Sequence, residues 1–234
     1  MTDDSKLPDT HRAEFYKSHR ERSATTYKKK HRRQFDREFR DLTGADPSMS
    51  VLEIGCGTGL FLRYLEAGGY RQVAGIDSDE NLLETLSGLA GSEIHIGDAP
   101  AVLAEHFAGR SFDRIVMFDV AEHIDLPDLV TLLKMLRTHL ADDGRLLLRV
   151  PNIESPWGLR MFFGTFDHVT QLGPGRLREL AAMTGWNCVS VMPQEPVPVL
   201  RRWRERIVNG LLAKMLSYHP EIWTANVLAV YARD

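Results

Sequence analysis

Cysteine is scarce in this sequence. Only Cys56 and Cys188 occur among the 234 residues, and they lie far apart with no neighbouring metal-binding motif. A disulfide framework needs several cysteines at set spacings, and a structural zinc site needs paired cysteines or histidines. The sequence therefore indicates neither, and we expect Cys56 to serve as a small residue inside a glycine-rich turn.

Long apolar runs and a strong net charge are also absent. No stretch of about 18 uninterrupted apolar residues occurs, and the first residues lack the apolar core of a signal peptide. The formal net charge of −3 excludes a polycation that would bind nucleic acid by charge alone. We therefore expect a globular, cytoplasmic protein whose length suits one α/β domain with additions.

Three glycines at alternate positions dominate the first third of the chain. Val51–Ile54 is a short apolar run, which is typical of a buried strand, and Gly55, Gly57 and Gly59 follow it. Glycine allows a sharp turn and the close approach of a ligand to the backbone. Thr58 is a candidate cap for the helix that follows. A strand, a glycine turn and a helix N-terminus together predict a nucleotide site at the edge of a parallel sheet.

The spacing of these glycines does not match a dinucleotide fingerprint, because Leu60 stands where the third glycine would be. The stretch E-I-G-C-G-T-G instead resembles the first motif of the class I S-adenosylmethionine (SAM)-dependent methyltransferases. The resemblance implies SAM as cofactor and S-adenosylhomocysteine as product. It also assigns Glu53, Gly55, Gly57 and Gly59 to cofactor binding.

Acidic residues also follow the next two predicted strands. Gln72–Ile76 ends at Asp77, whose carboxylate can accept hydrogen bonds from both hydroxyls of a ribose. Ser78 is a further candidate contact, although Ser78 or Asp79 can also cap the next helix. In the family that the chain resembles, an acidic residue after the third strand meets the adenine amino group. That comparison assigns Asp98 to the adenine and the neighbouring Ala99 to the ring.

The fourth predicted strand, Phe112–Phe118, is followed by Glu122 and His123. This run resembles the corresponding motif of ubiquinone-type and sugar O-methyltransferases, and it places Phe118 among the cofactor contacts. The Asn/Asp-Pro-Pro-Tyr sequence of enzymes that methylate base amino nitrogens is absent, which argues against a nucleic-acid substrate.

The fold class that we expect is α/β, with a Rossmann-like, doubly wound, seven-stranded sheet whose last strand is antiparallel. Residues 1–45 are predicted to form an N-terminal helical lid, and residues 46–234 the SAM-binding methyltransferase domain. That domain carries a cap segment at 153–170 and a C-terminal helical insertion at 199–218. Tyr16 or Tyr27 is a candidate to close over the cofactor. The basic run at 11–40 is either a solvated helix surface or a part of the lid that attracts an anionic substrate.

A hydroxyl acceptor needs a group that removes its proton, and histidine is the usual base at neutral pH. His168 is one candidate, with Asp167 beside it to orient the ring, and His123 is the other. Either histidine could instead have a structural role. No metal site is predicted, because the spacing of Glu122, Asp125 and Asp128 is typical of helix capping.

The chain is thus identified as a class I SAM-dependent methyltransferase. The most favoured acceptor is a sugar hydroxyl in a polysaccharide or glycosylated metabolite, and a quinone or phenol is the alternative. An inactive SAM-binding partner subunit is a second kind of function. RNA or membrane binding through the basic run is a third, and it predicts steep salt dependence. The expected partner is a small-molecule or glycan acceptor and not nucleic acid. The basic amphipathic helix at 199–218 is a candidate for peripheral membrane contact or a homodimer interface, or it packs on its own domain.

Overall fold

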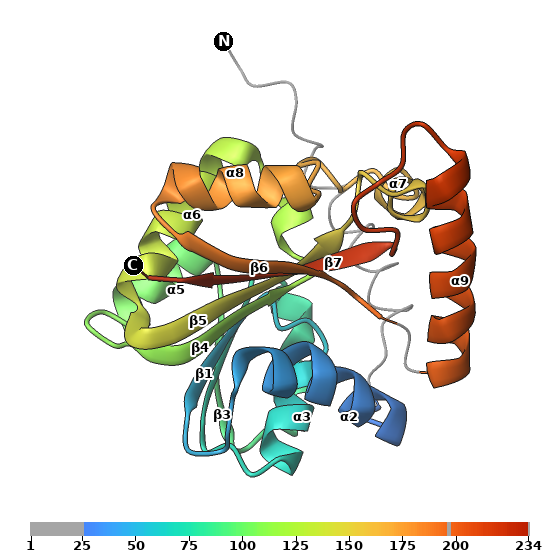
Figure 1. Cartoon of the computed structure of the whole chain (residues 1–234). Coiled ribbons are helices and arrows are strands. Elements are labelled where there is room, and N and C mark those ends of the chain that lie inside the picture. Colours follow the sequence, from blue (N-terminus) through green and yellow to red (C-terminus); the bar gives the residue numbers. More distant parts are fainter. Residues whose placement is uncertain (1–25, 196–197, 234) are drawn as a thin grey trace.

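Seven strands form one mixed sheet in the order β3-β2-β1-β4-β5-β7-β6, as Figure 1 shows for a computed structural model that describes residues 26–195 and 198–233. The strands are β1 (Ser50–Ile54), β2 (Gln72–Asp77), β3 (Ser92–Ile96), β4 (Phe112–Phe118), β5 (Leu140–Pro151), β6 (Asn187–Pro193) and β7 (Asn226–Ala232). Strand β7 is antiparallel to both of its neighbours, and the other neighbouring strands are parallel. The predicted fold class is confirmed.

The order of the strands reverses at β1. Strand β2 pairs with one edge of β1, and β4 pairs with the other edge. All five residues of β1 are buried, as expected for a central strand that is covered on both faces. In an open parallel sheet, a ligand binds where the strand order reverses, beyond the carboxyl ends of the strands. The predicted glycine turn begins directly after β1 and therefore lies at this point.

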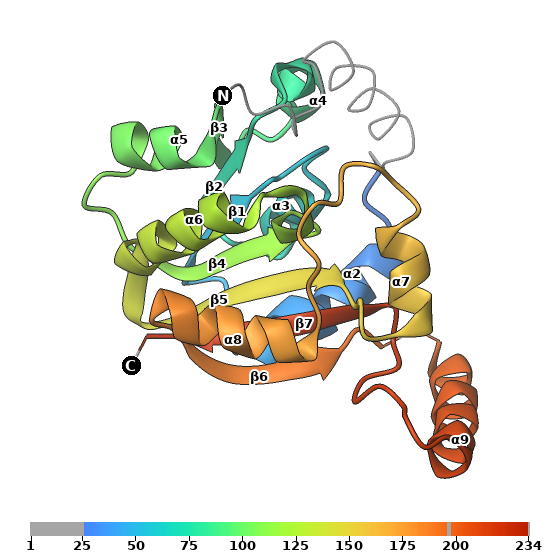
Figure 2. The ribbon, with the colours of Figure 1, turned by 90° about the horizontal axis from the view of Figure 1, so that it is seen from above.

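Helices cover both faces of the sheet (Figures 1 and 2). One hydrophobic core joins the sheet to α5, α6 and α8, and a second core joins it to α2, η1, α3 and α4. The helical elements are α2 (Lys29–Phe35), η1 (Asp36–Asp41), α3 (Leu60–Ala67), η2 (Glu80–Leu82), α4 (Leu83–Leu86), α5 (Ala99–His106), η3 (Ala121–His123), α6 (Leu126–Thr138), α7 (Pro156–Phe162), α8 (Pro174–Thr184) and α9 (Val199–Met215).

The first described helices belong to the second core. Phe35 of α2 and Phe39 of η1 are buried against Phe61 and Tyr64 of α3, with ring centroids 5.0 to 6.4 Å apart. The division of the chain at residue 45 stays a prediction, and Tyr16, with the rest of residues 1–25, lies outside the described residues.

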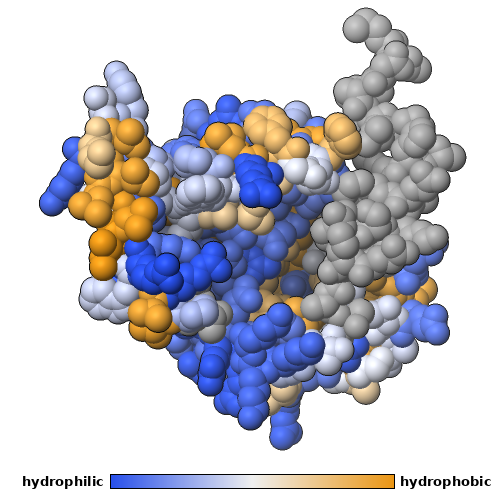
Figure 3. Space-filling view, turned by 90° about the vertical axis from the view of Figure 1, so that its right-hand side faces the viewer, coloured by the Kyte–Doolittle hydropathy of each residue, from blue (hydrophilic) through white to orange (hydrophobic). Residues whose placement is uncertain are grey.

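Helix α9 lies apart from the sheet at the edge of the molecule in both ribbon views. None of its residues is buried. Its apolar side chains gather in an exposed patch at the left of Figure 3. The patch consists of Val199, Leu200, Trp203, Ile207, Val208, Leu211 and Met215. Packing of this helix on its own domain, one of our expectations, is therefore not observed. Within the described residues, no helix combines the length and apolar character needed to cross a membrane.

Candidate functional site

A cavity of about 660 Å³ lies at the carboxyl edge of β1, β2 and β4. Its size is in the range of small-molecule sites in proteins. Most of the predicted site residues line it: Glu53, Gly55, Gly57, Asp77, Ser78, Asp98, Ala99, Phe118, His123 and Asp167. Gly59, Tyr27 and His168 are not among the lining residues.

Two of the three glycines shape the floor of this cavity. Gly55 has a φ of +71°, and a Cβ atom there would lie 2.3 Å from Cγ2 of Val120. The N–H of Gly57, which has a φ of +51°, donates a hydrogen bond to Oδ2 of Asp77 at 2.7 Å. No atom lies within 4 Å of a Cβ placed on Gly57, so the backbone there is open to a ligand.

The third glycine does not line the cavity, so its assignment to cofactor binding stays a prediction. Gly59, with a φ of +73°, is the N-cap of α3, and a Cβ atom there would lie 2.5 Å from Cδ1 of Leu89. Its small size therefore lets α3 approach the segment after α4. The helix begins at Leu60 without a side-chain cap, so the predicted capping by Thr58 is wrong. Tyr27 packs near Tyr64 and His31, with ring centroids 6.5 Å away in each case, instead of lining the cavity.

Asp77 is held by the backbone on both sides. Besides Gly57, the N–H of Asp79 donates to Oδ1 of Asp77 at 3.0 Å. Asp79 accepts a hydrogen bond from the N–H of Asn81 at 3.1 Å and so caps η2, as expected. Burial raises the pKa of Asp77, although the two backbone hydrogen bonds favour its charged form. The carboxylate is thus fixed at the strand end and faces the cavity.

Glu53 is the least satisfied polar group beneath the glycine turn. It is 4% exposed, and its Oε2 atom has no hydrogen-bond partner among the described residues. Burial, together with the nearby charge of Asp77, raises the pKa of Glu53 well above its usual range. A buried polar atom without a partner is costly, and a ligand with hydrogen-bond donors would remove that cost. The cavity, the open turn and these two carboxylates fit SAM, which carries ribose hydroxyls and an ammonium group.

Asp98 and Phe118 are two further predicted cofactor contacts that line the cavity. Asp98 is the N-cap residue of α5 but makes no capping hydrogen bond, so helix capping does not account for its side chain. The guanidinium carbon of Arg149 lies 4.4 Å from the centre of the Phe118 ring. Arg149 also donates to Asp119 at 2.9 Å and to Glu38 at 2.8 Å. Burial acts against its charge, but these two carboxylates raise the pKa of Arg149.

Arg149, Asp119 and Phe35 line the cavity and were not predicted. A sequence signal existed for one of them, because Arg149 interrupts an otherwise apolar strand. A charged residue in a buried strand requires a partner.

Two histidines meet beside the cavity: His123 lines it, and His168 packs against His123. The rings of His123 and His168 lie 4.7 Å apart between centres and are steeply inclined. Nδ1 of His123 lies 2.7 Å from Oδ2 of Asp167, whereas Nδ1 of His168 lies 3.1 Å from the carbonyl oxygen of Phe162. Asp167 therefore orients His123 and not His168, which corrects our expectation. The N–H groups of Val169 and Thr170 donate to the carbonyl of Glu122 and hold this loop against η3.

The protonation states of the two histidines and of the neighbouring Glu122 depend on one another. Burial lowers the pKa of His168, and the neighbouring His123 lowers it further. Burial also acts against the charged form of His123, but the hydrogen bond to Asp167 and the charge of Glu122 raise its pKa overall. Burial raises the pKa of Glu122, which is 1% exposed. The cavity is thus lined by Glu53 and Asp77 at the glycine turn and by His123 and Asp167 at η3.

Comparison with known proteins agrees with this geometry. A family described as a methyltransferase domain matches residues 19–191. A SAM-dependent methyltransferase from Archaeoglobus fulgidus has a similar structure, with a TM-score of 0.66 and 18% identity over 86% of this chain and 93% of that one.

The CcbJ methyltransferase from Streptomyces caelestis gives a TM-score of 0.63 at 13% identity, over 94% of this chain and 95% of that one. The glycopeptide N-methyltransferase MtfA, solved with the SAM analogue sinefungin, gives 0.59 at 16% identity, over 91% of this chain and 97% of that one. No curated protein sequence shows a significant match. The chain therefore belongs to the methyltransferase domain family and is an enzyme that uses SAM as its cofactor.

Proposed function

We propose that this methyltransferase transfers a methyl group to a hydroxyl of a sugar, in a polysaccharide or a glycosylated metabolite. The observation that carries the proposal is the pair His123 and His168 beside η3, in which Asp167 holds His123 and both of these residues line the cavity. A sugar hydroxyl is weakly acidic, so its proton must be removed as the oxygen attacks. Two imidazoles beside η3 suit that demand.

The residues of the chain divide the task between the glycine turn and the histidines beside η3. The cofactor supplies a methyl group on a positively charged sulfur, which becomes a neutral thioether when the methyl leaves. Asp77 holds the ribose hydroxyls, and the backbone at Gly57 admits the cofactor close to the turn. The side chains beside η3 must hold the acceptor oxygen in line with the methyl carbon, at about 3 Å.

The test is a comparison of acceptors with and without one histidine. His168→Ala should lower kcat by about 100-fold or more with a sugar acceptor, because the His168 imidazole no longer assists removal of the hydroxyl proton. The same variant should change the rate with a phenol much less, since a phenol hydroxyl loses its proton more readily than a sugar hydroxyl does. His106→Ala is the matched control, because His106 lies at the end of α5 outside the cavity lining, with its ring stacked on His95 and near Glu105.

Three results would count against the proposal. Methylation of phenols but of no sugar would favour the quinone or phenol alternative. An equal loss with both acceptor types would mean that His168 does not act on the hydroxyl. SAM binding without transfer to any acceptor would favour a partner subunit that has lost its activity.

A further inference from the structure

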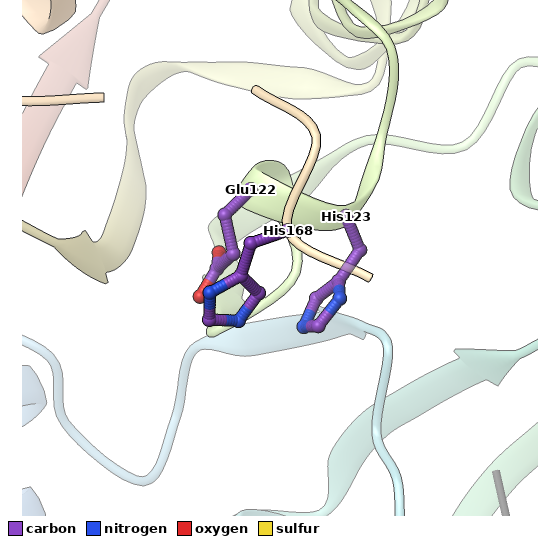
Figure 4. A group of neighbouring side chains, drawn as sticks. All are labelled: Glu122, His123 and His168. Carbon is purple, nitrogen blue, oxygen red and sulfur yellow. The ribbon is translucent and has the colours of Figure 1, made fainter. Parts of the chain in front are cut away.

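Glu122 joins the two histidines to form a cluster with the composition of a metal site (Figure 4). Glu122, His123 and His168 each offer one ligand atom, and these three atoms lie within 4.8 Å of one another. Glu122 and His123 come from η3, and His168 comes from the loop that follows α7. Small side-chain rotations would bring all three to the usual distance of about 2.0–2.2 Å from one ion.

Glu122 has a buried carboxylate that its described surroundings do not fully satisfy. It is 1% exposed, and its Oε2 atom has no hydrogen-bond partner in the described part of the chain. Burying a carboxylate is costly unless a cation or several donors satisfy it. Arg149 is fully engaged by Asp119 and Glu38, so its hydrogen bonds go elsewhere. A cation beside Glu122 would supply the missing partner.

Each of the two imidazole rings has an oxygen atom of the protein within hydrogen-bond distance of its Nδ1 atom. The carboxylate of Asp167 lies 2.7 Å from Nδ1 of His123, and the carbonyl of Phe162 lies 3.1 Å from Nδ1 of His168. Metal-binding histidines characteristically donate one ring N–H to a carboxylate or a backbone carbonyl, which fixes the ring for the ion. Both types of support are present here, and both engage Nδ1.

We infer that Glu122, His123 and His168 bind one divalent transition-metal ion beside the cavity. Two imidazoles and a carboxylate suit Zn²⁺, Mn²⁺, Fe²⁺ or Co²⁺, and a three-residue set leaves positions open for an acceptor oxygen. His123 also lines the cavity, so an ion there is within reach of an acceptor. This set of three residues could not be recognised in the sequence, because His168 is 45 residues beyond His123 and only the folded loop brings them together.

The inference rests on the proposed function and states how the histidines act on the hydroxyl. An ion makes a bound hydroxyl more acidic, as it does for water. The hydroxyl proton then passes to bulk water, and the oxygen forms its bond to the methyl carbon. The electron pair of the carbon–sulfur bond returns to the sulfur. The histidines serve as ligands in this scheme and not as free bases.

The experiment is a Co²⁺ titration of the full chain after removal of metals with a chelator. Visible absorption and calorimetry should show one Co²⁺ ion bound per chain. Glu122→Gln and His168→Gln should each weaken that binding by at least about 10-fold, since even supporting residues of metal sites have effects of this size. Asp167→Asn should weaken it by about 10- to 100-fold.

Two controls accompany the titration. The double variant His95→Gln/His106→Gln removes a stacked histidine pair on the surface, with ring centres 4.1 Å apart, and should leave the stoichiometry at one. Glu122→Gln should retain the SAM affinity of the wild type within about twofold, since Glu122 does not line the cofactor cavity. That result would show that the variant is folded.

The inference is overturned if the wild-type chain binds no Co²⁺ at millimolar concentration. It is also overturned if binding survives in Glu122→Gln and His168→Gln but is lost in the surface double variant. The titration contains no acceptor, so an error in the acceptor class leaves its result unchanged. Conversely, full-rate methylation of a sugar by metal-free protein would eliminate the ion and retain the proposed function.

Discussion

Gly55 combines two constraints that can be separated by experiment. Its φ of +71° is unfavourable for other residues, and a Cβ atom would meet Val120 at 2.3 Å. Gly69 has a φ of +86°, but a Cβ atom there would meet no other atom within 4 Å, so it has the first constraint alone. Gly69→Ala should therefore cost only the backbone strain, about 1 kcal/mol. Gly55→Ala should cost more, because the clash adds to the strain.

Thermal unfolding measures this difference. One kcal/mol corresponds to about 2–4 °C in Tm for a chain of this size. We expect Gly69→Ala to lower Tm by a few degrees and Gly55→Ala to lower it at least twice as much. Gly55→Ala should also weaken SAM binding, because the turn must move away from Val120. Equal Tm values for the two variants would mean that Val120 can move away from the added Cβ atom at little cost in free energy.

At the scale of single residues, chemistry at strand ends was the predictable part of the site. Asp77 could be predicted because it stands at the end of a predicted strand, and Glu53 and Asp98 could be predicted from the resemblance to methyltransferase motifs. The partner of Asp167 could not be predicted in the same way. Asp167 and His168 are adjacent in the chain, yet the carboxylate turns to His123, which is 44 residues away. Side-chain direction in an irregular loop depends on the tertiary contacts of that loop.

Arg149 joins three elements, because it connects β5 to Asp119 after β4 and to Glu38 of η1. Its side chain is 12% exposed and that of Glu38 is 6% exposed. Arg149→Met would leave the carboxylate of Glu38 buried without its cation, at a cost of about 3 kcal/mol or more. The expected loss in Tm is about 6 °C or more.

The matched control is Arg178→Ala, which removes an ion pair with Glu221 whose partners are 46% and 54% exposed. Solvent-exposed pairs contribute at most about 1 kcal/mol, so Tm should fall by no more than about 4 °C. Calorimetry on both variants provides the comparison. A smaller loss for Arg149→Met than for Arg178→Ala would show that Glu38 finds another partner.

Replacing a leucine should affect stability very differently in the exposed helix α9 and in the packed helix α8. Leu211 of α9 is 57% exposed, whereas Leu177 of α8 is fully buried. Leu177→Ala should cost about 2–5 kcal/mol, because it leaves a cavity in a packed core. Leu211→Ala should change the free energy of unfolding by less than about 0.5 kcal/mol, as is usual at the surface.

Chemical denaturation of the isolated chain measures both leucine variants. A large loss for Leu211→Ala at low protein concentration would mean that α9 packs on its own domain in solution. A loss that appears only at high concentration would instead favour the predicted homodimer. The predicted membrane contact stays a prediction, which flotation of the chain with anionic vesicles would test.

At the scale of the whole molecule, the order of elements could be predicted and the packing of the ends could not. Parallel strands alternate with helices from Ser50 to Thr184, and this alternation leaves few possible topologies. The amphipathic pattern of α9 predicts a helix with an apolar side but does not say what that side meets. Periodicity records which residues avoid water, whereas the partner that covers them is a property of the three-dimensional arrangement.

The position of β7 has a consequence for the order in which the enzyme can mature. Strand β7 follows β6 and α9 in the chain, yet it lies between β5 and β6 in the sheet. The side chains of Asn152 and Ser155, which begin the segment leading to α7, donate to carbonyls between residues 222 and 224. A ribosome makes the glycine turn and the histidine loop long before these carbonyls exist. The segment that leads to α7 and the histidine loop can therefore reach its final contacts only after the residues just before β7 have been made.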